Sequence, residues 1–318
     1  MKVYVLYARE NWITDVLYNE WVQHNREYYT DNIDEADTVW VLSNYIIGAI
    51  PREVLKEKRV ITTIHHITPW KVDERRASLY KYVNEVTDVF HSICEKTTGW
   101  MCKFGFDKPI ITIPFWNNEK LWYNTEVNRS ELGLPKDAYL VGSFQRDTEG
   151  AGIPKGIYEP KLEKGPDIFI EAIKCLKEQH ANLQVVLTGR CRDYVIGELE
   201  RLGIKYIYYQ MCTQELMNKL YNGLDLYIVA SRVEGGPRAI NEAALTCTPL
   251  YSTDVGIAPY ICNRDSIFDM KKPHTILKCR ANTEWNYKQA MEYSIKNHME
   301  KFTKTVFRSK NIKKFDTI

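Results

Sequence analysis

Short apolar runs rich in Val, Ile and Tyr alternate along the chain with longer stretches in which apolar residues recur at helical spacing. The short runs predict buried strands at Val3–Tyr7, Thr38–Leu42, Val60–Ile64, Val89–Ile93, Ile110–Ile113, Tyr139–Phe144, Gln184–Thr188, Lys205–Tyr209, Asp225–Val229 and Pro249–Ser252. Asp15–Asn25 and Glu95–Phe104 are examples of the predicted helices between them. Strands that alternate with helices predict parallel sheets covered on both faces.

The strand pattern is interrupted by a polar, aromatic and turn-rich stretch from Phe115 to Lys136, after which it restarts. A chain of 318 residues has room for two domains of about 150 residues each. The sequence therefore predicts an α/β protein of two Rossmann-like, doubly wound domains, residues 1–125 and 126–283, that face a central cleft. A C-terminal helix in 284–318 is a candidate to complete the first domain. Such sheets bind ligands at the carboxyl ends of their strands.

Composition narrows the class of protein. Hydrophobic residues make up 44% and charged residues 26%, as in soluble globular proteins, and the formal charge of +2 argues against a dedicated nucleic-acid binder. No apolar run approaches the roughly 20 residues of a membrane-spanning helix, and the N-terminus is expected to be a strand, not a signal peptide. The eight cysteines are scattered without a C-x-x-C pair, so we expect reduced thiols, no zinc site and a cytoplasmic location.

Charge is unevenly distributed between the two ends of the chain. Residues 1–50 contain three basic and eight acidic side chains, whereas residues 296–318 contain seven basic and two acidic ones. The basic tail is compatible with peripheral contact to a membrane surface or to DNA. The aromatic and apolar residues interspersed with it, such as Trp285, Met291 and Phe302, favour a docked helix with a solvated basic face.

Several common nucleotide-binding and catalytic motifs are missing. Neither Val3–Tyr7 nor Tyr139–Phe144 is followed by G-x-G-x-x-G, which argues against a dinucleotide oxidoreductase. The sequence also lacks G-x-x-x-x-G-K-[ST] and G-x-S-x-G, the motifs of P-loop NTPases and of serine hydrolases.

The segment with the clearest chemistry follows the predicted strand Asp225–Val229. It reads Ser-Arg-Val-Glu-Gly-Gly-Pro-Arg-Ala-Ile-Asn-Glu-Ala from Ser231 to Ala243. Gly235 and Gly236 let the backbone approach a ligand, and Pro237 suits the first turn of a helix whose free N–H groups attract phosphate. Glu234 and Glu242 could accept hydrogen bonds from hydroxyl groups of one bound molecule. The segment alone is equally compatible with an acid that favours the helix dipole and a solvent-facing Glu.

The continuation of this segment, Thr248-Pro249-Leu250 and Thr253-Asp254-Val255-Gly256, extends the pattern. With Glu234 and Glu242, spaced eight residues apart, it resembles the signature of family 4 glycosyltransferases, which have the GT-B fold. The resemblance implies that Glu234 orients the sugar of a nucleotide-diphosphate donor and that Glu242 binds its ribose. It also implies a retaining reaction that needs no metal and no cofactor besides the donor, a UDP- or GDP-sugar.

The resemblance extends over most of the chain. Val141 to Arg146, which includes Gly142 and Ser143, and Glu163 to Asp167 are similar to the opening of the family's donor-binding domain. There an Arg and a Lys hold the diphosphate, roles that fall here to Arg146 and Lys164, and Lys155 or Lys161 could compete with Arg146. Two fixed cations stabilise the charge that the leaving nucleotide gains. Arg146 and Lys164 are eighteen positions apart, more than is usual in the family, because an insertion from 147 to 163 separates them.

Weaker matches complete the implied donor site. Arg190 follows a strand-end glycine turn and could reach a phosphate or form a surface ion pair. Met211 and Cys212 lie in a segment similar to the family's loop whose backbone faces the nucleotide base. Cys247 stands where the family usually has Gly, and we expect it to belong to the core.

The N-terminal domain carries the acceptor side of the resemblance. His65 ends a strand and matches a His that in relatives faces the donor sugar, while His66 stands where an Asp is common. Asn11 and Trp12 follow the first strand, where many relatives have glycines, and are expected to line the acceptor side from their position. His65 is also compatible with a purely structural role.

These features predict a glycosyltransferase that moves a sugar from a nucleotide-diphosphate sugar to a hydroxyl acceptor, expected to be a glycan. Donor binding is assigned to residues 126–283 and acceptor binding to residues 1–125. Two alternatives remain open at this stage. One is another GT-B activity, a sugar-nucleotide epimerase or a phosphorylase, and the other is a catalytically degenerate binder of nucleotide sugars.

Overall fold

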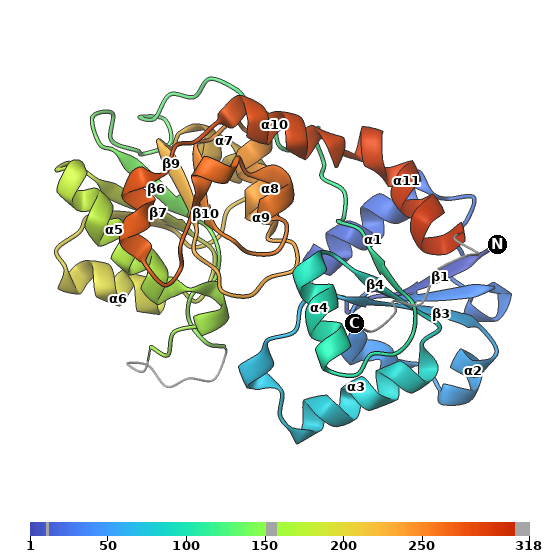
Figure 1. Ribbon diagram of the computed structural model, residues 1–318. Helices are drawn as coiled ribbons and strands as arrows, with labels where there is room; N and C mark the ends of the chain where they lie inside the picture. Colours follow the sequence, from blue (N-terminus) through green and yellow to red (C-terminus); the bar gives the residue numbers. More distant parts are fainter. Residues whose placement is uncertain (11–12, 151–157, 309–318) are drawn as a thin grey trace. The chain divides into compact units, whose positions relative to one another are not determined.

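The computed structural model of the chain describes residues 1–10, 13–150 and 158–308 (Figure 1). The chain forms two compact units, Met1–Phe115 with the chain from His298 onward, and Trp116–Asn297. The sequence suggested a boundary after residue 125, but in the structure the second unit already begins at Trp116. The reason is that residues 116–125 are hydrogen-bonded to the second unit. Asn117 N donates to Tyr293 O at 2.7 Å, and Tyr123 N donates to Asn218 Oδ1 at 3.0 Å.

The first unit contains a parallel sheet in the order β1-β2-β3-β4-β5. Its strands are β1 (Val3–Leu6), β2 (Thr38–Val41), β3 (Arg59–Ile64), β4 (Val89–Ser92) and β5 (Ile110–Thr112). An isolated parallel bridge joins Val3 to Tyr29 on the other edge of β1. The chain therefore passes one side of β1 before it returns to form β2 on the other side. This reversal is the topological switch of a doubly wound sheet.

Helices cover both faces of this sheet. They are α1 (Ile13–His24), α2 (Arg52–Lys56), α3 (Glu74–Val86), α4 (Glu95–Lys103) and α11 (Ile295–Arg308). On one face Trp40 of β2 packs against Trp21 of α1 and Phe307 of α11, with ring centroids 5.6 and 5.3 Å apart. Phe302, Val306 and Phe307 of α11 are buried, so this helix packs on the first unit. The sequence suggested a single helix over 284–318, but residues Thr283–Glu292 form a separate helix that belongs to the second unit, and Trp285 there is 48% exposed.

His91 of β4 lies in this core and is hydrogen-bonded at both ring nitrogens. Nε2 donates to the Ile113 carbonyl at 2.8 Å, so Nδ1 of the neutral ring accepts from Thr63 Oγ1 at 3.0 Å. Trp40 Nε1 in turn donates to Thr63 Oγ1 at 2.9 Å. Burial lowers the pKa of His91 to about 3, because the charged form of the ring would lose its hydration.

Acid is therefore expected to destabilise the first unit through His91. An unfolded histidine takes up a proton near pH 6.5 whereas the folded ring stays neutral until about pH 3. The stabilising contribution is fully present well above pH 6.5 and declines as the pH falls toward 3, by roughly 2 kcal/mol between pH 6.5 and 4.5. Urea unfolding at several pH values should show this slope, and His91→Asn should reduce it, while the buried His65, whose pKa is lowered to about 4, keeps its own share. An unchanged slope in the variant would exclude His91 as its source.

The second unit contains a parallel sheet in the order β11-β10-β9-β6-β7-β8. Its strands are β6 (Leu140–Ser143), β7 (Gln184–Thr188), β8 (Tyr206–Tyr209), β9 (Leu226–Val229), β10 (Leu250–Thr253) and β11 (Ile267–Phe268). Its helices are α5 (Pro166–Gln179), α6 (Asp193–Arg201), α7 (Gln214–Asn222), α8 (Arg238–Leu245), α9 (Ala258–Ile261) and α10 (Thr283–Glu292). All the strands predicted from the sequence are confirmed within one or two residues at each end, and β11 was not predicted.

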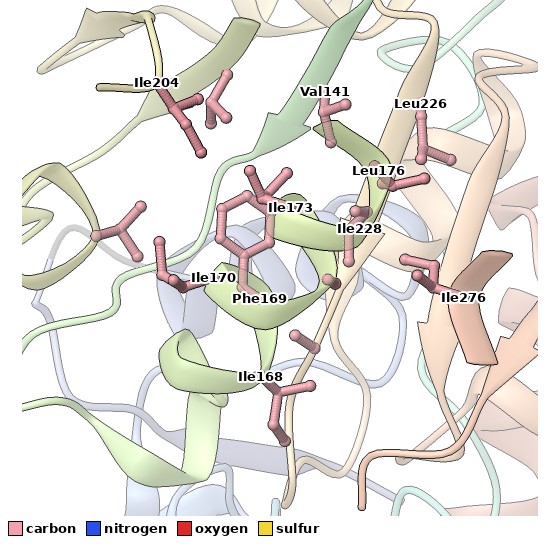
Figure 2. Close-up of a cluster of buried hydrophobic side chains, with 14 of the residues drawn as sticks. Val141, Ile168, Phe169, Ile170, Ile173, Leu176, Ile204, Leu226, Ile228 and Ile276 are labelled. Atoms are coloured by element: carbon pink, nitrogen blue, oxygen red, sulfur yellow. The ribbon is translucent and has the colours of Figure 1, made fainter. Parts of the chain in front are cut away.

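The core of the second unit is built around α5, whose apolar side chains lie against the sheet. Phe169, Ile173 and Leu176 pack with strand residues such as Val141 and Ile228 in one buried cluster (Figure 2). Among the described residues, no helix has the length and apolar character needed to cross a bilayer.

Candidate active site

The candidate site lies where the strand order of the second sheet reverses. The chain leaves β6 toward β7 and β8 on one side and returns on the other side as β9, which pairs directly with β6 through Val141↔Leu226 and Gly142↔Tyr227. The loops that follow these two strands therefore begin side by side. In an open parallel sheet this is the position of the ligand crevice.

The structure brings Lys164 and Glu234 together at this position, as an ion pair between Lys164 Nζ and Glu234 Oε1. The Glu234 side chain is 9% exposed and that of Lys164 is 22% exposed. Ser231 Oγ donates within 3.4 Å of Glu234 Oε1 and lies equally close to Gln145 Oε1, from the loop after β6. A carboxylate and a cation, both largely shielded from bulk water, are thus held beside the two strand ends.

Lys164 is positioned by a tight turn that ends in Gly165. The backbone of Gly165 is left-handed, with φ of 63°, and a Cβ there would lie 1.9 Å from the Ala230 carbonyl oxygen. Only glycine allows this approach of the turn to the end of β9. Two backbone N–H groups of the next turn, those of Arg232 and Val233, donate to Glu163 O at 2.9 and 3.1 Å. The turn that carries Lys164 is therefore fixed to the turn that carries Glu234.

Arg232 reinforces the same junction with its side chain. Its guanidinium donates to both carboxylate oxygens of Asp167, at 2.7 and 2.5 Å, and to Leu162 O at 3.0 Å. Burial alone would raise the pKa of Asp167, but the hydrogen bonds and charge of Arg232 bring it below its usual value. Nothing but its position in the motif singled out Arg232 before the structure was known.

The second half of the motif supports the turn at Glu234. Gly256 has φ of 51°, and a Cβ there would lie 2.5 Å from the Gly235 carbonyl oxygen and 2.9 Å from Pro237 Cδ. Thr253 Oγ1 donates to Ser231 O at 2.5 Å. The Thr-x-x-Gly pattern thus has a physical cause, because its Thr and Gly pack against the Glu-Gly-Gly-Pro turn. Pro237 is the N-cap of α8, the residue just before Arg238.

Glu242 lies on α8 behind this turn and is not an ordinary solvent-facing residue. Its Oε2 accepts a hydrogen bond of 2.9 Å from the buried Tyr221 hydroxyl. Burial raises the pKa of Glu242, and the charge of Arg238 and the hydrogen bond from Tyr221 oppose this rise. The motif thus places two carboxylates, Glu234 and Glu242, at the start and in the body of one turn–helix unit.

Arg146 is placed differently from Lys164. Its Nε donates to Thr148 O at 3.0 Å, and its guanidinium lies along the first residues of the insertion, beside Gly150. Within the described ranges, Arg146 makes no hydrogen bond or ion pair with Lys164 or Glu234. The ends of the insertion pair with each other, since Glu149 N donates to Glu159 O at 2.9 Å and Lys161 N to Asp147 O at 2.7 Å. This closure lets Lys164 reach the site despite the insertion.

Gly142 and Ser143 have internal partners. A Cβ on Gly142 would lie 2.2 Å from Leu224 Cδ1, so this glycine makes room for a core side chain. Ser143 O and Oγ accept hydrogen bonds from Arg192, at 2.5 and 3.2 Å. Arg192 is 1% exposed, is also paired with Asp147, and was missed by sequence reasoning because no motif surrounds it.

The remaining predicted donor-side residues lie on or near the surface. Arg190 is exposed, and Met211, after β8, is 63% exposed. Cys212 is partly buried, with Sγ 3.9 Å from Tyr209 O, and burial raises the pKa of its thiol. Cys247 is partly buried with a left-handed φ of 55°, the conformation that glycine adopts most readily.

In the first unit, His65 follows β3 and His66 is exposed. His65 Nε2 donates to Leu42 O at 2.8 Å, and its ring packs against Phe115 at 5.7 Å between centroids. Burial lowers the pKa of His65 to about 4, so this ring is neutral at pH 7. Asn11 and Trp12 lie outside the described residues. In the described part of the chain, no group of three or more His, Cys, Asp or Glu side chains is arranged to hold a metal ion.

Comparison with known proteins places this geometry in context. Residues 159–276, which contain Lys164, Glu234 and Glu242, match the family model described as Glycosyl transferases group 1. A search of curated proteins found no match. Among solved structures, HepE from Anabaena in complex with UDP is 15% identical, with a TM-score of 0.74 over 97% of this chain and 100% of that chain. HepE was also solved in complex with UDP-glucose.

Two further structures show the same architecture. Sucrose-phosphate synthase from Thermosynechococcus elongatus is 13% identical, with a TM-score of 0.68 over 94% of this chain and 79% of that chain. A glycosyltransferase from Rickettsia africae ESF-5 is 15% identical, with a TM-score of 0.61 over 96% and 85%. The chain therefore has the GT-B fold that the sequence predicted. Its second unit contains the segment that matches group 1 glycosyl transferases.

Proposed function

We propose that the protein is a retaining glycosyltransferase that takes its donor, a nucleotide-diphosphate sugar, at the crevice of the second unit. The observation that carries this proposal is the ion pair of Lys164 and Glu234, held beside the ends of β6 and β9 by two interlocked turns. The match to group 1 glycosyl transferases and the UDP and UDP-glucose complexes of HepE support a nucleotide-sugar donor.

In this proposal each residue of the crevice has a separate task. Lys164 binds the diphosphate, and its charge stabilises the negative charge that develops on the leaving nucleotide. Glu234, released from Lys164 when the diphosphate binds, accepts hydrogen bonds from sugar hydroxyls, and Glu242 accepts them from the ribose. Arg146 is a second candidate cation for the diphosphate, provided that its side chain turns away from Thr148.

The bonds that change are those at the anomeric carbon. The bond from this carbon to the diphosphate oxygen breaks with its electron pair, and the acceptor oxygen bonds to the carbon on the same face. The acceptor hydroxyl proton passes to the leaving phosphate oxygen, so the products are the glycoside and the nucleotide diphosphate. We assign acceptor binding to the first unit, with a glycan as the expected acceptor.

A binding screen tests the proposal directly. UDP, GDP and ADP, and their sugar conjugates, should be compared by calorimetry and thermal unfolding. A donor at 100 times its Kd should stabilise the second unit by about 2.7 kcal/mol. Retention should then be verified from the anomeric configuration of the product by NMR. Binding of none of these nucleotides would exclude the proposal, and conversion of the donor sugar to its epimer in the absence of an acceptor would instead identify an epimerase.

A further inference from the structure

Two fully buried tyrosines lie behind Glu242, and neither belongs to the motif that the sequence singled out. Tyr221 lies in the last turn of α7 and Tyr227 lies in β9, and both are 0% exposed. Their rings pack together with centroids 5.0 Å apart, and Trp122 meets Tyr221 edge-on at 5.8 Å. A buried hydroxyl group is costly unless it is hydrogen-bonded, so the partners of these two groups are informative.

Each of the two hydroxyl groups has a hydrogen-bond partner, and the partner of Tyr221 is a carboxylate. The Tyr221 hydroxyl donates to Glu242 Oε2 at 2.9 Å, and Phe144 N donates to the Tyr227 hydroxyl at 2.9 Å. Since an ionised carboxylate can only accept, the single Tyr221 proton goes to Glu242. Tyr227 packs against the Tyr221 ring and is itself held by the backbone of Phe144.

The hydrogen bond from Tyr221 reaches only one of the two carboxylate oxygens of Glu242. Within the described ranges, Oε2 accepts from Tyr221, and no protein group donates a hydrogen bond to Oε1. Thr248 Oγ1 donates to the backbone carbonyl of Tyr221 at 2.8 Å, and this bond holds the end of α7 in place. The carboxylate is therefore held in one orientation by a rigid, fully buried donor.

We infer that Tyr221 is a positioning residue that fixes the Glu242 carboxylate for the two ribose hydroxyl groups of the donor, with Tyr227 supporting it from β9. This inference rests on the proposed function, in which Glu242 binds the ribose. The consequence is a selectivity for ribonucleotides over nucleotides without ribose hydroxyl groups, set by a side chain that does not touch the ligand.

The test compares two ligands on each variant, so that a general loss of stability cancels. Affinities for UDP and 2′,3′-dideoxy-UDP are measured by calorimetry on the full chain, or for GDP and its dideoxy form if GDP binds more tightly. The unaltered protein should prefer the ribonucleotide by at least about tenfold, as expected for hydrogen bonds to a charged group. Glu242→Gln should remove most of this preference. Tyr221→Phe should reduce it several-fold, with little change in affinity for the dideoxy form.

Tyr206→Phe is the matched control, because its hydroxyl donates to Glu200 Oε1 at 2.8 Å near the end of α6. It should leave the preference unchanged. If Glu242→Gln removes the preference and Tyr221→Phe keeps it, the inference is wrong while the proposed function stands. If Glu242→Gln also keeps it, or if no nucleotide binds, the assignment of Glu242 fails and the inference fails with it.

Discussion

Replacing Lys164 by alanine is expected to lower the turnover number by at least about 100-fold, the scale seen when a group that stabilises developing charge is removed. Glu234→Ala should have an effect of similar size, since the carboxylate would no longer orient the sugar. Both are measured by release of nucleotide diphosphate in the presence of an acceptor extract. Lys174→Ala is a control in the same unit, because the exposed Lys174 of α5 also pairs with a neighbouring acid, Glu171, at 3.0 Å.

The ion pair between Lys164 and Glu234 also leads to a prediction for the stability of the protein, which distinguishes an effect on folding from an effect on catalysis. Lys164→Ala leaves a carboxylate that is 9% exposed without its cation, a loss of about 1–3 kcal/mol. The double variant Lys164→Ala/Glu234→Gln should recover much of this stability, since no unpaired charge remains, yet stay inactive. Near-normal turnover in both Lys164→Ala and Glu234→Ala would remove the assignment of the site.

Local sequence patterns were sufficient to predict the strands, and also the turn and helix that follow β9. Period and composition identify β9 and the helix after it, and the positive φ angles of Gly165 and Gly256 explain why glycine stands at those positions. Period and composition depend on neighbouring residues along the chain, so a single sequence carries them, whereas the need for glycine at positions 165 and 256 also comes from close contacts with Ala230 and Gly235.

Contacts between distant residues could not be predicted in the same way. Tyr221 and Glu242 are 21 positions apart, and Arg192 and Asp147 are 45 apart. The apolar residues around Tyr221 in the sequence indicate only that it is buried. Its distance along the chain from Glu242 does not show that its hydroxyl donates to that carboxylate. Arg146 was selected because its position in the sequence matches that of an Arg in the family. That match does not determine the direction of its long side chain, which donates to Thr148 O.

Arg192 should be the most sensitive of these distant contacts. It forms a buried ion pair with Asp147, their side chains being 0% and 4% exposed, and donates to Ser143 O and Thr188 O at the ends of β6 and β7. Burial raises the pKa of Asp147 in spite of the charge of Arg192. Arg192→Met should therefore lower the free energy of unfolding of the second unit by about 3–5 kcal/mol, because an uncompensated buried acid remains.

The cause can be separated from a simple loss of packing. Arg192→Met/Asp147→Asn removes both charges and should recover part of the lost stability, whereas Arg201→Met, which breaks an exposed pair with Glu198, should change it by less than about 0.5 kcal/mol. Urea unfolding followed for the second unit distinguishes these cases. A loss as large in the double variant as in Arg192→Met would show that the hydrogen bonds to Ser143 and Thr188, and not the charge of Asp147, make Arg192 necessary. In that case the hydrogen bonds of Arg192 would be what joins the end of β6 to the end of β7.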